Sequence, residues 1–288
     1  MTTSVVPPPP ALGVTADHLL SSASSRTILV TFLGAIVRPA GDWMPISAAV
    51  GLMGGLGVDE SSVRTAVFRL KKRGWLVADQ RGDVKGYSLT QVATRSFSEG
   101  DNVIWHSRVP ADLADGWCVV NVSVPERERE RRHQLRARFS TLGFGNMGSG
   151  MWIAPARAAA SAKETLEQLG LTAMSATFVG RYEPGRPLAQ IVRSAWDLKA
   201  LNDGYRDFLA TYSPVESAVR ETSPSDADAF RIYLAAVDQW RKLPFRDPGL
   251  PPELLDAEWR ASDAGRVFER LVDRLEPAAL RWAGAHWS

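Results

Sequence analysis

A polar helix followed at once by two short β-runs is the feature that most restricts how this chain can fold. Asp59–Arg73 places apolar residues at helical spacing and stops at Gly74. The runs WLVADQ and VKGYSLT follow, on either side of Arg81-Gly82-Asp83, and predict a β-hairpin with a glycine turn. Upstream, apolar periodicity predicts two further helices, Ser25–Val37 and a shorter one over Pro45–Met53. The N-terminal third should therefore be three helices followed by a hairpin.

That order is typical of a winged helix-turn-helix, and the third helix supports it. Asp59 is placed to cap the helix, and the apolar residues at positions 63, 66, 67 and 70 share one stripe that should pack on the other helices. The opposite side carries hydroxyl and guanidinium groups, which suit base edges and phosphates in a major groove. We predict DNA contacts from Ser61, Ser62, Arg64, Thr65, Arg69, Lys72 and, in the hairpin, Arg81 and Lys85. Phe68 lies on the same side; we expect it to pack against the hairpin, with contact to a thymine methyl as the alternative.

The charge distribution agrees with this interpretation. The whole chain has a formal net charge of only +2, but Arg64–Arg95 holds eight basic and two acidic residues. A patch of that size can displace counterions from DNA phosphates. The alternative is a solvated helix face, but such a face usually mixes Glu with Lys, and the third helix has no acid after Glu60.

Composition narrows the class of protein. A length of 288 residues suggests two or three domains, each with its own core. The single Cys118 excludes an intrachain disulfide framework, fits a reducing cytoplasm and is expected to be buried and inert. No apolar run reaches the roughly 18–20 residues of a membrane span. The first residues contain Pro7–Pro10 and no basic segment before an apolar run, so we expect a flexible arm, not a signal peptide.

The rest of the chain predicts two further regions. Strands over Trp117–Val124, Met151–Ala154 and Ala176–Tyr182 alternate with two helices, a β-α-β-α-β order that suggests a small ferredoxin-like sandwich. After Gln190 the pattern is helical. The fold class is thus α+β, with a disordered arm (1–24), a winged helix (25–98), a linker (99–115), a ferredoxin-like domain (116–188) and a helical C-terminal domain (189–288).

The other motifs give little evidence of a nucleotide-binding, metal or catalytic site. Gly143-Phe-Gly145-Asn-Met-Gly148 matches a dinucleotide-binding pattern, but it follows a helix and precedes a strand, so we interpret it as a tight turn. The four histidines are scattered, which predicts no metal site. The ERERERR segment within the helix Glu126–Leu142 is expected to be a solvated, self-paired face, with a second DNA contact as the alternative.

Four segments resemble the PaaX family of transcriptional repressors, which control aromatic (phenylacetic) acid catabolism. They are SSRTILVTFLGAIVRP, VDESSVRTAVFRLKKRGWL, LGFGNMGSGMWIAP and LPFRDPGLPPELLDAEW. The resemblance implies a winged helix, a central domain similar to the Cas2 nuclease fold and a helical C-terminal domain. It also implies a homodimer on a palindromic duplex operator, released by an aryl-CoA thioester such as phenylacetyl-CoA. No cofactor, metal or membrane partner is implied.

The resemblance leads to a candidate effector site and to one rival function, and the basic face of the chain leads to another. Aromatic and cationic side chains after residue 190 could hold an aryl-CoA, although any one of these tryptophans could instead be a core residue. The effector candidates are Arg193, Trp196, Tyr205, Trp240, Lys242 and Arg246. A Cas2-like nuclease would hold a metal with an Asp at the end of its first strand, but WCVVNVSV offers only Asn121. The other rival is a scaffold protein whose basic face binds acidic partners.

Overall fold

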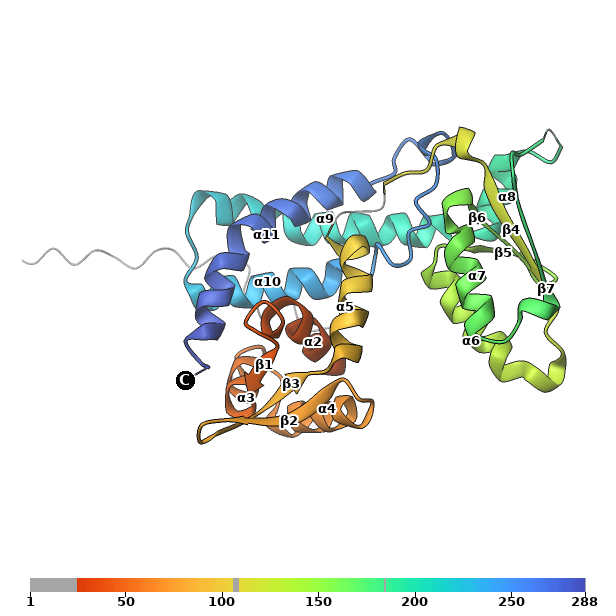
Figure 1. Cartoon of the computed structure of the whole chain (residues 1–288). Helices are drawn as coiled ribbons and strands as arrows, with labels where there is room; N and C mark the ends of the chain where they lie inside the picture. Colours follow the sequence, from red (N-terminus) through yellow and green to blue (C-terminus); the bar gives the residue numbers. More distant parts are fainter. Residues whose placement is uncertain (1–24, 106–108, 184, 288) are drawn as a thin grey trace, which may run out of the picture. The chain divides into compact units, whose positions relative to one another are not determined.

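The computed structural model describes residues 25–105, 109–183 and 185–287 (Figure 1). The predicted N-terminal arm, residues 1–24, lies outside this range. The chain divides into two compact units, each built from separate stretches of sequence. The first contains the described residues up to Asp101, Asp207–Trp240 and the residues from Asp263 onward, and the second contains Asn102–Arg206 and Arg241–Ser262. The segment expected as one C-terminal helical domain thus contributes to both units.

The first unit contains the predicted winged helix-turn-helix. Its helices are α2 (Ser25–Phe32), which continues as the π-helical turn η1 (Leu33–Val37), α3 (Ile46–Gly54) and α4 (Glu60–Lys72). Its antiparallel sheet has the order β1-β3-β2, from β1 (Trp43–Pro45), β2 (Leu76–Arg81) and β3 (Val84–Leu89). The predicted stripe of α4 is confirmed, since Val63, Ala66, Val67 and Leu70 are all buried.

Strand β1 was not predicted, and it moves the start of the second helix. Pro45 pairs with Gly86 of β3 and so belongs to the sheet, and α3 begins only at Ile46. Gly86 is required for this pairing, because a Cβ atom there would overlap the carbonyl oxygen of Met44 and the ring of Trp43. The pairing of β1 with β3 therefore depends on Gly86, and hydrophobic periodicity does not reveal the role of this glycine.

The predicted linker 99–115 is wrong in its first part. Helix α5 spans Gln91–Ile104, and its buried or half-buried residues Ala93, Phe97, Gly100 and Ile104 follow a helical spacing. Polar residues and a glycine between them suggest a break, but packing of this stripe keeps the helix intact. Arg38 also holds Asp101 through an ion pair of 2.9 Å, which ties the end of α5 to the first helix.

The first unit also contains three C-terminal helices, of which α10 packs on α2 of the winged helix. These are the second part of α9 (Leu198–Glu221), then α10 (Asp226–Trp240) and α11 (Ala261–Gly284). The buried Thr31 hydroxyl of α2 donates to the Asp238 carboxylate of α10 at 2.7 Å. Near the C-terminus, the Trp287 indole N–H donates to the Trp43 carbonyl of β1 at 2.9 Å. The winged helix is therefore one side of a larger helical body.

The second unit has the predicted ferredoxin-like fold, with one more strand than the sequence suggested. Its elements are β4 (Trp117–Val122), α6 (Arg129–Thr141), β5 (Gly145–Gly148), β6 (Met151–Pro155), α7 (Ala159–Gln168) and β7 (Ser175–Gly180). The antiparallel sheet has the order β5-β6-β4-β7, which completes the β-α-β-β-α-β pattern of this fold. The unit also contains short 3₁₀ turns before, between and after these elements: η2 (Leu113–Asp115), η3 (Glu126–Glu128), η4 (Ala156–Ala158), η5 (Thr172–Met174) and η6 (Pro252–Leu254).

Both faces of this sheet are covered at β4 and β6, whereas the edge strand β7 is mostly exposed. On one face, strand residues such as Val120 and Trp152 join Leu135 and Phe139 of α6 and Leu166 of α7 in a core. On the other face, alternate strand residues pack against helix α8 (Leu188–Ala195) and the chain around residues 250–255. Cys118 is buried, as predicted, and burial raises the pKa of its thiol to about 11. The thiol is therefore protonated at neutral pH.

The glycine-rich motif forms the first strand of the β5–β6 hairpin, which corrects the prediction of a simple turn. Gly145 lies in β5 under the ring of Trp196, and a Cβ atom there would lie 2.6 Å from that ring. Gly150 closes the β5–β6 turn with a φ of +79°, and a Cβ atom would overlap the carbonyl oxygen of Val122. These glycines serve close packing of backbone and side chain. The motif leads into strand β5 and ends with it, and it does not begin a helix, so these residues lack the nucleotide-binding geometry.

Candidate nucleic-acid interface

The polar face of α4 begins with a tight cap. The Asp59 carboxylate accepts the Ser62 backbone N–H at 2.9 Å and the Ser61 hydroxyl at 2.6 Å. These hydrogen bonds lower the pKa of Asp59 to about 2, so the cap is ionised at neutral pH. Asp59 thus fixes the first turn of the helix and already engages Ser61 in the free protein.

The cations that follow on α4 differ in whether they already make an ion pair with a neighbouring side chain. Arg64 is held by Glu60, with its Nε atom 2.7 Å from the carboxylate. Arg69 and Lys72 are exposed and make no ion pair with any residue in the described ranges. Thr65 is exposed between them. Of the three cations predicted on this helix to contact DNA, Arg69 and Lys72 are therefore unengaged, whereas Arg64 must exchange Glu60 for another anion before it binds elsewhere.

The hairpin contributes a second set of cations. The Arg81 guanidinium lies over the ring of Trp43, 4.7 Å from the centroid, and 3.9 Å from the carboxylate of Asp79. Lys85, on the neighbouring strand, is exposed. Arg81 and Val84 form the last strand pair, so Gly82, with a φ of +58°, begins a two-residue turn. The ring of Trp43 thus positions one cation at the tip of the wing.

The expected packing of Phe68 against the wing is wrong. Its side chain is 65% exposed, whereas the wing buries Leu76 and Leu89. The buried stripe of α4 fills the space between helix and sheet, so Phe68 remains on the outward face beside Arg64 and Arg69. An exposed aromatic ring among arginines is unusual for a solvated helix and gives the face an apolar contact point.

All eight basic residues between Arg64 and Arg95 are exposed. Hydroxyls, guanidinium groups and one aromatic ring are therefore presented by a single helix, with further cations on the adjacent hairpin. This arrangement can hydrogen-bond to base edges and neutralise phosphates.

The six predicted effector residues are not brought together. Trp240 is a core residue of the first unit, stacked on Phe268 at 4.8 Å between ring centroids. Tyr205 is buried in the second unit, where its hydroxyl donates to Asp247 at 2.8 Å. Trp196 and Arg246 line a common cavity, of about 290 Å³. Arg193 and Lys242, on the surface of the second unit, do not line it.

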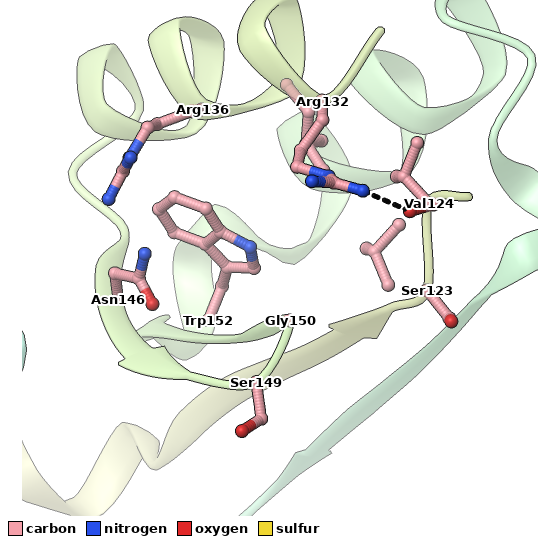
Figure 2. A pocket seen from close by; sticks show the side chains of 10 residues that line it. Ser123, Val124, Arg132, Arg136, Asn146, Ser149, Gly150 and Trp152 are labelled. Carbon is pink, nitrogen blue, oxygen red and sulfur yellow. Dashed lines mark hydrogen bonds between the residues drawn. The ribbon is translucent and has the colours of Figure 1, made fainter. Parts of the chain in front are cut away.

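A second cavity, of about 380 Å³, lies between α6 and the β5–β6 hairpin of the second unit (Figure 2). Arg132, Arg136, Asn146 and Trp152 line it, and none was predicted as a site residue. The predicted self-paired face of α6 is correct for Arg131 and Arg132, which contact Glu128 and Glu126 at 3.0 and 2.9 Å. Arg136 lies outside that pairing, and its spacing of four residues from Arg132 is the signal that could have singled it out.

Neither a metal site nor a membrane span is found in the described part of the chain. Asn121 is an exposed residue of β4, paired with Met151 and Ala176. In residues 25–105, 109–183 and 185–287, no three His, Cys, Asp or Glu side chains gather as metal ligands. Within the same ranges, no helix is both long enough and apolar enough to cross a bilayer.

Comparisons with known proteins cover nearly the whole chain. Residues 24–93 match the family model described as PaaX-like protein, 110–192 the PaaX protein central Cas2-like domain, and 196–285 the PaaX-like protein C-terminal domain. The transcriptional repressor PaaX of Escherichia coli is 26% identical over 262 residues, which are 89% of this chain and 82% of that protein. The uncharacterized protein Rv0674 from Mycobacterium tuberculosis has a similar fold, with a TM-score of 0.57 at 18% identity over 91% of this chain and 98% of that one.

Proposed function

Since this chain belongs to the PaaX family, whose three models together cover most of its length, we propose that it is a transcriptional repressor that binds a specific duplex operator. The observation that carries this proposal is the outward face of α4, where Arg64, Thr65, Phe68, Arg69 and Lys72 are all exposed. Helices with this mixture of donors and apolar groups read bases in the major groove.

Footprinting on the DNA upstream of the protein's own gene tests this function. A repressor should protect a short site, and excess unrelated duplex should fail to displace it. A basic scaffold protein would bind both DNAs alike through its charge alone. Equal competition by unrelated DNA would therefore favour the scaffold over the repressor.

We expect Arg69→Ala to weaken operator binding by about 5- to 150-fold and to relax specificity at one base pair. One arginine that reads guanine through two hydrogen bonds contributes about 1–3 kcal/mol of discrimination. Arg64→Ala should act in the same direction. Arg69 is the sharper test, because Arg64 is already engaged by Glu60 at 2.7 Å. Affinities for the operator and for single-base variants of it would be measured by fluorescence anisotropy.

Two further variants serve as controls for that measurement. Lys85→Ala, in the wing, should weaken binding to all sequences alike, because a phosphate contact carries no base information. Val67→Ala removes a buried side chain and should lower the melting temperature, while the folded protein still binds. If Arg64→Ala and Arg69→Ala both bind the operator as tightly as the parent, α4 is not the reading helix.

We also propose that the repressor acts in the cytoplasm as a homodimer on a palindromic site and that an aryl-CoA thioester releases it from DNA. Family membership supports both parts. Half-sites should then lie about one helical turn apart or a multiple of it. By linkage, an effector that weakens DNA binding tenfold must bind the DNA-bound protein tenfold more weakly than the free protein.

A further inference from the structure

Two cavities of the second unit share three lining residues, so they adjoin one another and together make a groove. The cavities have volumes of about 380 and 290 Å³, and both are lined by Arg136, Asn146 and Trp152. Ligand sites in proteins span about 300–1,000 Å³. We call this feature the arginine–tryptophan groove and define it by Arg132, Arg136, Asn146, Trp152, Trp196 and Arg246.

One end of the groove is cationic and partly fixed in place. Arg132 is held by Glu126 and by the Val124 carbonyl, which accepts from its guanidinium at 2.8 Å. Figure 2 shows Arg132 and Arg136 on either side of the Trp152 ring, with Arg136 pointing toward Asn146. Arg136 is exposed and has no ion pair or hydrogen bond within the described ranges. A free guanidinium near an amide, in the same cavity as an ordered guanidinium, suits an anion such as phosphate.

The other end of the groove is aromatic. Trp196 is fixed by a hydrogen bond from its indole N–H to the Gly143 carbonyl at 3.1 Å and by its packing on Gly145. Phe144 and Leu201 line the same end, and Arg246 adds a cation at its edge. Because Gly145 allows the ring of Trp196 to approach β5 so closely, this apolar wall is preformed.

We propose that the arginine–tryptophan groove binds the effector, which must combine phosphate groups with a planar apolar acyl group. This assignment rests on the proposed function, in which an aryl-CoA thioester releases the repressor. The cationic end takes the phosphates of the carrier, and the end at Trp196 takes the acyl group. A ligand of that class spans both cavities, whereas a free aromatic acid fills only one of them.

The groove is also linked to the first unit through α9. The Asp197 carboxylate lines the groove and caps α9 by accepting the Ala200 backbone N–H at 3.0 Å. Residues of α9 up to Arg206 belong to the second unit, and those from Asp207 belong to the unit that contains the winged helix. A ligand that shifts Trp196 and Asp197 therefore acts on a helix that both units share.

Calorimetry on the full chain tests the groove with three probes: phenylacetyl-CoA, coenzyme A alone and phenylacetate. We expect Arg136→Ala to weaken phenylacetyl-CoA and coenzyme A binding tenfold or more, because a hydrogen-bonded charge pair is lost. Phenylacetate binding should be unchanged. Arg138→Ala is the matched control, since Arg138 lies on the same helix but bonds to Gln168 of α7 at 2.6 Å, away from the groove.

The possible outcomes distinguish a failure of the groove assignment from a failure of the proposed effector. If the parent binds phenylacetyl-CoA and is released from the operator, but Arg136→Ala responds like the parent, the effector stands and the groove assignment is overturned. An equal loss in Arg138→Ala would also overturn it, because the effect would then be one of general charge. If the parent binds none of the three probes, both the effector and the groove fail. Arg136 is exposed, so the variant should melt with the parent.

Discussion

Operator affinity should fall by about 10³- to 10⁵-fold when salt is raised from about 50 to 200 mM, a slope of log K against log salt of roughly −5 to −8. The physical reason is counterion release by the basic residues between Arg64 and Arg95, all eight of which are exposed. A dimer presents two such surfaces. If each subunit neutralises a few phosphates, the proposed homodimer reaches a slope of this size.

Fluorescence anisotropy titrations at four or five salt concentrations would give the slope. Lys85→Ala is the matched variant, and it should flatten the slope by about one for each Lys85 in the complex. A slope near zero would contradict the phosphate contacts altogether. A steep slope that is the same for operator and unrelated DNA would leave the contacts in place but remove the specificity that a repressor requires.

The parts of this fold that could be predicted from sequence are those governed by local rules. The stripe of Val63, Val67 and Leu70 follows the period of a helix, and Asp59 forms the expected cap. The hairpin turn at Gly82 also matches its sequence signal. In each case the residues that determine the structure lie within a few positions of one another.

The elements that were not predicted depend on contacts with residues far away in the sequence. Strand β5 has no β-branched residue, and it forms because it pairs with β6 and supports Trp196, about fifty positions away. Helix α5 passes through polar residues and a glycine because its far end packs and pairs with the first helix. Local propensity cannot register such contacts, since tertiary packing overrides it.

The same division holds for the candidate sites. The residues of α4 that we propose contact DNA share one helix face, so periodicity alone placed them together. The groove takes residues from α6, two strands and the segment before α9, which only the tertiary fold brings together. Aromatic and cationic residues after position 190 were therefore a poor guide, since Trp196 and Trp240 belong to different units.

Replacement of Trp240 by alanine is expected to cause the largest loss of stability. Its ring stacks on Phe268 at 4.8 Å and lies 5.4 Å from Phe208, so three helices of the first unit meet at this residue. The side chain is 1% exposed. Trp240→Ala should therefore reduce the free energy of unfolding by about 3–5 kcal/mol, as is usual when a buried aromatic ring is replaced by a methyl group. For a unit of this size, we expect a fall in melting temperature of about 10 °C or more.

Trp240→Phe is the matched control for this prediction. It keeps a ring against Phe268, so it should lose much less stability than Trp240→Ala in thermal melts followed by circular dichroism. Both variants should bind phenylacetyl-CoA like the parent at temperatures where they are folded, because Trp240 does not line the groove. If Trp240→Ala instead melts with the parent but no longer responds to the effector, Trp240 is a ligand contact. The groove around Trp196 would then be the wrong site.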